Sequence, residues 1–159
     1  MSHLKRVELS GFKSFRAAVV RLRPGLNVLI GPNGSGKSNF VGAFSFLRRV
    51  VDGDLEQVVN EAGGADRLLH HGRKVTQRIK LGFWVGDNSY GLELVPAKDR
   101  LLCSEEVGYR FDLNPEWTAS ISRGSRSSRL RSEAGRGRVA GYVLRALDRW
   151  SVFHVHDTS

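Results

Sequence analysis

The chain has 159 residues, of which 40% are hydrophobic, so it can bury one core and has the size of about one domain. Its single cysteine, Cys103, excludes an internal disulfide. The opening segment MSHLKRVELS contains no apolar run, which argues against a secretory signal or a membrane span. We therefore expect a cytoplasmic protein.

The formal net charge is +9 at pH 7, and the sequence pI is near 10.4. Clustered Arg and Lys side chains bind phosphates and release the counterions condensed on nucleic acid, so this charge favours a polyanionic partner such as DNA. A basic surface that only keeps the chain soluble accounts for the charge equally well. Both interpretations stay open.

The first 52 residues predict three strands and a helix. The strands are expected at residues 4–10, 17–22 and 26–30, and the last of them, LNVLI, is nearly all apolar, which is typical of a strand buried on both faces. A helix is expected from about Gly36, because apolar residues then recur at spacings of three and four, namely Phe40, Ala43, Phe44, Leu47 and Val51.

Composition and period divide the rest of the chain into four further segments. Residues 53–75 predict a connecting helical segment, and residues 76–117 predict an antiparallel meander, since apolar and polar residues alternate on both sides of GDNS. Residues 118–138 are rich in Ser, Arg and Gly and lack an apolar period, which predicts a mobile loop. Residues 139–159 predict a helix and a terminal strand.

The strongest motif is GPNGSGKS, which begins at Gly31 and fits G-x-x-x-x-G-K-[ST], the Walker A phosphate-binding loop, between a predicted strand and a predicted helix. The glycines let successive N–H groups point into one concavity, and the helix N-terminus adds its positive dipole end. Lys37 is expected to reach the β- and γ-phosphates of ATP, and the Ser38 hydroxyl to ligate Mg²⁺. The predicted nucleotide-binding residues are Asn33, Gly34, Ser35, Gly36, Lys37, Ser38 and Asn39.

GFKSF, followed by GLNVLIGPNGSGKSNFVGAFSFL, resembles the N-terminal ATP-binding segment of ABC-type ATPases of the RecF and SMC kind, and is most similar to AAA-family, OLD-like ATPases of bacteria. Asn39 and Ala43 match the family pattern, whereas Gly42 stands at a commonly acidic position. The resemblance implies an α/β fold, the N-terminal lobe of a P-loop NTPase with a mixed sheet, an attached antiparallel meander and an incomplete core. It also places Lys13 near the nucleotide phosphates.

Two motifs with which such ATPases hydrolyse ATP are not found in the sequence: the Walker B strand ending in Asp-Glu, and a Ser- and Gly-rich signature. Glu105 and Glu106 follow LLCS, and we interpret this pair as a solvated strand edge. Lys37 and Ser38 would then hold phosphates and metal while no group activates water, so we expect ATP binding with little or no turnover by this chain.

A strand such as residues 26–30 normally has parallel neighbours from later βα units, and the sequence offers none. We therefore expect the chain to be the N-terminal portion of a DNA-associated ATPase, acting for example in DNA repair. A homodimeric partner or a second ATPase half would supply the hydrolysis motifs. The alternative is a non-catalytic nucleotide-sensing or regulatory module.

Weaker signals carry less chemistry. His154 and His156 would share one face of a strand, but without a full ligand set we favour packing or hydrogen bonding over a metal site. Adjacent His70 and His71 face different ways, so paired ligation is not expected. Cys103 is expected to be a buried hydrophobe. The basic loop has two open interpretations: its arginines bind a nucleic-acid backbone, or they belong to a solvated, disordered loop. These arginines are Arg123, Arg126, Arg129, Arg131, Arg136 and Arg138.

Overall fold

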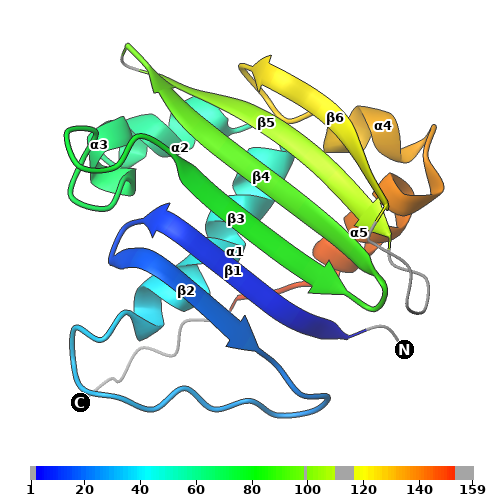
Figure 1. The fold of residues 1–159 in the computed structure, drawn as a ribbon, viewed down its shortest axis with the longest axis horizontal. Helices are drawn as coiled ribbons and strands as arrows, with labels where there is room; N and C mark the ends of the chain where they lie inside the picture. The colour runs from blue at the N-terminus through cyan, green and yellow to red at the C-terminus, as the bar shows by residue number, and fades with distance from the viewer. Residues whose placement is uncertain (1–2, 99, 110–116, 153–159) are drawn as a thin grey trace.

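The computed structural model describes residues 3–98, 100–109 and 117–152, and within them the strands form one six-stranded sheet (Figure 1). The spatial order of the strands is β2-β1-β3-β4-β5-β6, and every pair of neighbours is antiparallel. The strands are β1 (Leu4–Phe12), β2 (Phe15–Arg21), β3 (Ile79–Val85), β4 (Asn88–Ala97), β5 (Arg100–Tyr109) and β6 (Trp117–Ser125).

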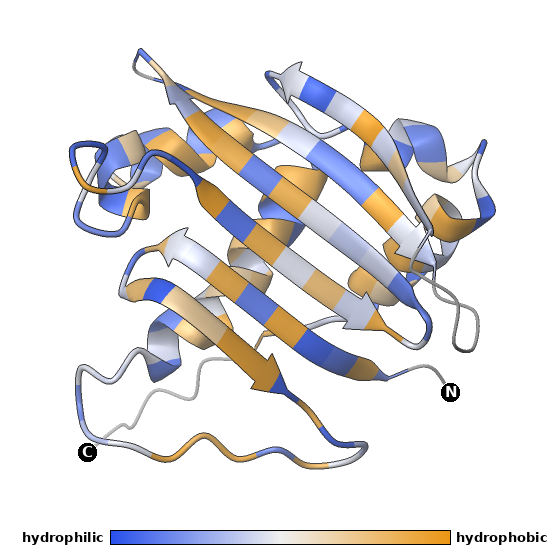
Figure 2. Ribbon diagram, in the orientation of Figure 1, coloured by the Kyte–Doolittle hydropathy of each residue, from blue (hydrophilic) through white to orange (hydrophobic). Residues whose placement is uncertain are grey.

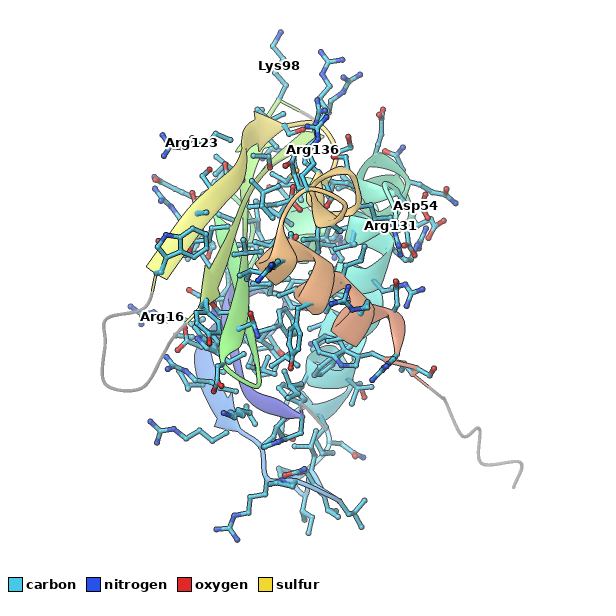
Figure 3. The ribbon with its side chains drawn as sticks, turned by 90° about the vertical axis from the view of Figure 1, so that its right-hand side faces the viewer. Arg16, Asp54, Lys98, Arg123, Arg131 and Arg136 are labelled. Atoms are coloured by element: carbon cyan, nitrogen blue, oxygen red, sulfur yellow. The ribbon has the colours of Figure 1, made fainter. Side chains whose placement is uncertain are left out.

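The helices lie on one face of this sheet, as the side view in Figure 3 shows, so the fold has two layers. They are α1 (Lys37–Val51), α2 (Leu55–Glu61), α3 (Ala65–Leu68), α4 (Leu130–Ala134) and α5 (Arg138–Asp148). None of the helices in the described part of the chain is long and apolar enough to cross a bilayer.

Alternation along the strands decides which face the helices cover, and Figure 2 shows the resulting bands of hydropathy. Leu9, Leu81 and Leu92 pair in register across β1, β3 and β4, and all three are buried under the helices. The next row, on the open face, runs from Glu8 through two paired glycines to Glu106. The sheet is therefore apolar on one face and mostly polar on the other.

Aromatic side chains join α1 to the sheet. The ring centroids of Phe12 and Phe46 are 5.2 Å apart, and Phe44 lies 5.7 Å from Phe83 and 5.2 Å from Trp150. Such edge-on and tilted pairs add to the stability that apolar burial provides. The long predicted helix thus forms as expected, with its apolar stripe against the sheet.

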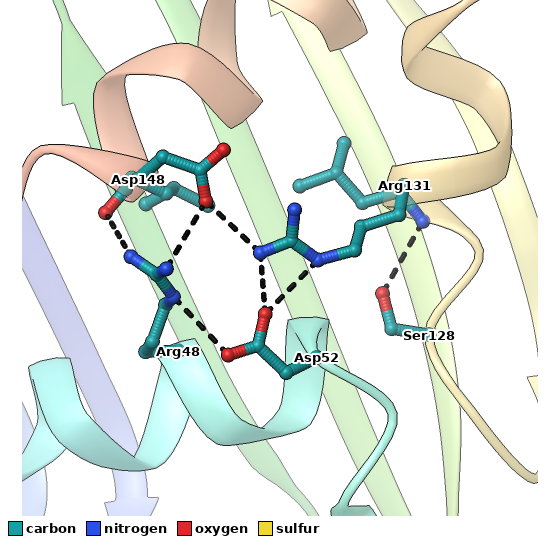
Figure 4. Close-up of polar contacts among 7 residues, drawn as sticks. Arg48, Asp52, Ser128, Arg131 and Asp148 are labelled. Carbon is teal, nitrogen blue, oxygen red and sulfur yellow. Dashed lines mark hydrogen bonds and ion pairs between the residues drawn. The ribbon is translucent and has the colours of Figure 1, made fainter.

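An ion network ties the C-terminal end of α1 to α4 and α5 (Figure 4). Asp52 accepts hydrogen bonds from Arg131 Nε at 2.9 Å and from Arg48 Nε at 3.2 Å, and Asp148 lies 2.9 Å from Arg131 and 3.4 Å from Arg48. Partial burial by itself acts to raise the pKa of Asp52, but the two arginines outweigh it and hold the pKa below its ordinary value.

The structure corrects two expectations about the sheet. It is antiparallel throughout its described strands rather than mixed, and residues 26–30 are not a strand. Residues 118–138 are likewise not a mobile loop, since they contribute to β6 and contain α4. A strand rich in Ser and Arg can form there because β6 is an edge strand that pairs only with β5 and keeps most side chains in solvent.

Candidate functional site

The loop of residues 31–36 leads directly into the N-terminus of α1. Gly36 is the N-cap residue and adopts a left-handed conformation with φ of 93°, which favours glycine. No side chain caps the helix, and its first turn contains no acidic residue. The first N–H groups of this 15-residue helix are therefore available to an anion, and the positive end of the helix dipole points the same way.

The ammonium group of Lys37 is folded back onto the loop that precedes it. It donates to the carbonyl oxygens of Gly31 and Pro32, each at 2.7 Å, and to Ser35 Oγ at 3.2 Å. No carboxylate pairs with Lys37 within the described residues. A positive charge thus lies within the loop, beside the uncapped helix end.

The turn between β1 and β2 packs against this loop. Asn39 Nδ2 donates to Ser14 Oγ at 2.9 Å. A Cβ atom on Gly36 would lie 3.0 Å from Ser14 Oγ and 3.1 Å from Phe15 Cζ, so a side chain there would require the turn to shift, in addition to the strain of its positive φ. The approach explains why a glycine ends the loop, and it brings GFKSF beside GPNGSGKS in space.

Residues 26–30, just before the loop, form neither helix nor strand and are exposed. Leu26 is 90% exposed and Ile30 is 91% exposed, which contradicts the prediction of a buried strand. An apolar strand is buried only when other strands flank it and a layer covers it, and no described strand pairs with this segment. Asn27 closes the preceding turn instead, since its side chain bonds the backbone N–H and carbonyl of Arg23.

The carboxylates of Glu105 and Glu106 do not form a solvated pair. Glu106 is exposed, whereas Glu105 is 2% exposed and faces the helices. Glu105 accepts hydrogen bonds from Tyr90 at 2.7 Å, Ser122 at 2.8 Å, Ser128 at 2.5 Å and the Arg129 N–H at 2.7 Å. A buried carboxylate needs hydrogen-bond donors in place of water, and these four bonds supply them. The Glu105 side chain can therefore be buried under the helices.

Two groups beside Glu105 are correspondingly inert. Burial, and then the Glu105 carboxylate, raise the pKa of Tyr90 well above its ordinary value, so the phenol keeps its proton and donates it. The same two causes raise the pKa of the buried Cys103 thiol to about 11. Cys103 is thus a small buried side chain, as expected, rather than a nucleophile.

The described residues contain no cluster of three His, Cys, Asp or Glu side chains that could hold a metal by themselves. At the loop, the Ser38 hydroxyl is exposed and is the one predicted metal ligand. It fits a Mg²⁺ ion whose remaining ligands come from phosphate oxygens and water, which is how Mg²⁺ is commonly held. His154, His156 and Asp157 lie outside the described residues.

Residues 3–60 match the family described as the RecF/RecN/SMC N terminal domain. The matched segment contains β1, β2, the loop and α1, which are the elements that surround Lys37. The N-terminal part of this chain is RecF/SMC-like. That agrees with the resemblance predicted from GFKSF and GPNGSGKS.

Three relatives are similar to different lengths of this chain. DNA replication and repair protein RecF of Acidothermus cellulolyticus is 38% identical over 102 residues, which are 60% of this chain and 24% of that protein. Urease accessory protein 2 of Cryptococcus neoformans is 31% identical over 147 residues, or 89% of this chain and 11% of that protein. Chromosome partition protein Smc of Mycobacterium tuberculosis is 50% identical over 64 residues, or 36% and 5%. The chain spans less than a quarter of each.

The nucleotide-binding role of the loop residues stays a prediction. The structure places Gly36 at the N-terminus of α1, folds Lys37 back onto Gly31, and engages Asn39 with Ser14. The contribution of Ser14 was not predicted. The one hint in the sequence was GFKSF, a turn between two predicted strands. Its distance from GPNGSGKS along the chain gave no indication that the two lie together.

Proposed function

We propose that residues 31–38 bind the phosphates of ATP. One arrangement carries the proposal: the Lys37 ammonium lies 2.7 Å from two loop carbonyls and beside the uncapped N-terminus of α1. Glycine-bent backbone, a lysine and free helix N–H groups together favour bound anions, and the similarity to RecF and Smc supports the same assignment.

Each group has a distinct task in this proposal. Lys37 exchanges its bonds to Gly31 and Pro32 for bonds to phosphate oxygens, which a point charge on a flexible stem can do. The N–H groups at the start of α1 donate to the same phosphate cluster. Ser38 supplies its hydroxyl to Mg²⁺, and the ion neutralises charge on the phosphates when bound.

Efficient hydrolysis is not expected of this chain. No carboxylate takes part in a recorded contact with residues 31–38 within the described structure, and the buried Glu105 is committed to four donors elsewhere. Phosphoryl transfer to water needs a group that positions the attacking water. The chain therefore holds nucleotide and leaves the hydrolytic groups to another segment or subunit.

The exposed segment 26–30 supports the same division of labour. Its apolar residues are exposed, and its backbone pairs with no strand in the described part of the chain, so its N–H and carbonyl groups are open to pairing with another strand. We propose that a further ATPase segment, on this or a second polypeptide, adds strands here and brings the acidic and signature motifs to Lys37. On this reading the chain is the N-terminal portion of a DNA-associated ATPase.

DNA association is supported by basic side chains at one end of the molecule. Figure 3 shows Lys98, Arg123 and Arg136 toward that end. The side chains of Lys98, Arg123 and Arg126 form no ion pair with any described residue. Unpaired cations of this kind bind phosphate backbones without reading bases. Affinity for duplex DNA that does not fall on changing Arg123 and Arg126 to Ser would refute this surface.

The decisive experiment is calorimetric titration of Mg-ATP into the full chain and into Lys37→Ala. The matched control is Lys80→Ala, which removes an ammonium on the open face of the sheet. We expect Lys37→Ala to abolish binding and Lys80→Ala to leave it unchanged. ATP at 100 times its dissociation constant should also stabilise a binder by about 2.7 kcal/mol, which a thermal melt reports independently.

Two outcomes contradict the proposal. Equal binding by the chain and by Lys37→Ala would place the nucleotide elsewhere, and no binding by a folded chain would remove the assignment altogether. Brisk Lys37-dependent phosphate release would overturn the separate claim that the hydrolytic groups lie outside the chain. A third outcome would favour the alternative, a non-catalytic sensing module: the chain binds ATP through Lys37, stays monomeric, and associates with no further ATPase segment.

A further inference from the structure

The two-residue turn that joins β1 to β2 contains a strained residue. Phe12 pairs with Phe15, so Lys13 and Ser14 make the whole turn. Lys13 has φ of 48°, a left-handed conformation that costs free energy for any residue with a side chain. Such a conformation persists only where surrounding contacts hold it.

The contacts that hold Lys13 come from the segment after α3. The Lys13 N–H donates to the Leu68 carbonyl at 2.8 Å, and the Lys13 carbonyl lies 2.8 Å from His70 Nδ1. Because a carbonyl only accepts, His70 Nδ1 carries the proton in this bond. The His70 N–H also donates to the Gly11 carbonyl at 2.9 Å. His70 therefore binds the turn from both sides of Phe12.

His70 is itself held in place. Thr76 Oγ1 donates to the His70 carbonyl at 2.5 Å. Gly11 allows this approach, because a Cβ atom there would lie 2.2 Å from the Arg78 carbonyl oxygen and 2.7 Å from the Thr76 methyl group. Gly11, at the end of β1, therefore packs closely against Thr76 and Arg78 beside His70.

The other side of the same turn contacts the phosphate loop. Ser14 accepts a hydrogen bond from Asn39 in the first turn of α1, and Ser14 and Phe15 lie against Gly36. Lys13 precedes this contact by one residue, is exposed, and forms no ion pair within the described residues. The Lys13 ammonium lies 5.6 Å from the centroid of the Phe12 ring, on a flexible stem in a turn that adjoins the anion-binding helix end.

We propose that His70 is a positioning residue for nucleotide: its imidazole fixes the Lys13–Ser14 turn against Gly36 and Asn39, so that the Lys13 ammonium meets the bound phosphates. The inference rests on the proposed ATP binding at residues 31–38. His70 does not touch the nucleotide and acts only through the turn. Its adjacent neighbour, His71, is exposed and makes no hydrogen bond to the turn.

A double-mutant cycle in the full chain tests this role. Lys13→Met removes the ammonium but keeps the carbonyl that His70 binds, and His70→Ala removes the imidazole. We expect each single variant to weaken Mg-ATP binding about tenfold, and the double variant to be no weaker than Lys13→Met alone, because the two changes act through one contact. His70→Asn, whose amide can donate from nearly the same place as Nδ1, should recover most of the affinity.

Controls separate positioning from folding. Gln77→Ala, which changes an exposed side chain in the same segment, should bind ATP as the unaltered chain does. Melting without nucleotide shows whether His70→Ala is folded. If His70→Ala unfolds, His70→Leu, which fills the space of the imidazole without a donor, takes its place in the cycle with Lys13→Met. Positioning predicts that the effects of these two changes on affinity do not add.

The failure of this inference differs from the failure of ATP binding itself. Lys37-dependent binding that is unchanged in a folded His70→Ala overturns the role of His70 alone. Independent, additive losses in the cycle overturn it too, since His70 would then act without Lys13. Absence of binding in the unaltered, folded chain overturns both proposals together.

Discussion

Two apolar segments of this chain have opposite surroundings. β3 reads IKLGFWV and lies between β1 and β4, where Leu81 and Phe83 are 2% and 1% exposed. Residues 26–30 read LNVLI and are more continuously apolar, yet Leu26 and Ile30 are almost fully exposed. The difference shows that flanking strands and a covering helix layer decide burial, and that apolar composition alone does not.

The largest test of this comparison removes an aromatic ring from β3. Phe83 contacts Phe44 and Trp150, with ring centroids 5.7 and 5.5 Å away. We expect Phe83→Ala to lower the free energy of unfolding by about 3–5 kcal/mol, because it leaves a cavity in the core. The matched change Ile30→Ala should alter it by less than about 0.5 kcal/mol, since Ile30 has little packing to lose.

Urea denaturation of both variants measures the difference. A large loss of stability in Ile30→Ala would mean that residues 26–30 are packed in solution, and the contrast between the two segments would then disappear. Equal small losses in both variants would show instead that the interior of the sheet is loosely packed around Phe83.

A second test contrasts neighbouring carboxylates on opposite faces of β5. Glu105→Ala leaves three hydroxyl groups and one N–H without their acceptor in the interior, so we expect a loss of about 3 kcal/mol. Glu106→Ala, on the open face, should cost less than about 0.5 kcal/mol. Denaturant midpoints provide both values, and similar losses would contradict the different burial of the two side chains.

The smallest expected effect concerns pH and the ion network of α1. The pKa of Asp52 is lowered in the folded chain, so this carboxylate contributes stability that is complete above its ordinary value of 3.8 and is lost as pH falls below it toward the folded value. Because Asp52 is partly exposed, we expect about 1 kcal/mol. Melting temperatures of the chain and of Asp52→Asn between pH 6 and about pH 2 should converge in acid.

Salt offers a control for the same network. Raising the ionic strength screens partly exposed charges, so the difference between the chain and Asp52→Asn should shrink at neutral pH. A difference that grows in acid would reverse the sign of the linkage and show that Asp52 is not held ionised by Arg131 and Arg48.

Much of the packed layer could be predicted from sequence because its patterns are local. Alternation from Ile79 identifies the β3–β4 hairpin, and the spacing from Phe40 identifies α1. The Walker A motif predicted a loop at the start of α1, because its glycines and the helical period that follows them are consecutive in the sequence. The resemblance to RecF and SMC proteins followed from the same short segment, and it agrees with the family match to residues 3–60.

What could not be predicted depends on residues far apart in sequence. Residues 26–30 are exposed because none of the described strands pairs with them, and no property of LNVLI itself shows that. Glu105 is buried because Tyr90, Ser122 and Ser128 reach it from other elements, so a carboxylate that composition assigns to the surface lies inside. The bond from His70 to Lys13 spans 57 positions and has no sequence motif.

Helix α1 has a different neighbour at each end: the phosphate loop adjoins Gly36, and the arginines of the ion network bind Asp52. Its 15 residues make a helix about 22 Å long. The helix that presents its N-terminus to the phosphate loop is thus the same element whose C-terminal end is anchored to α4 and α5, so the ion network and the loop depend on one shared support.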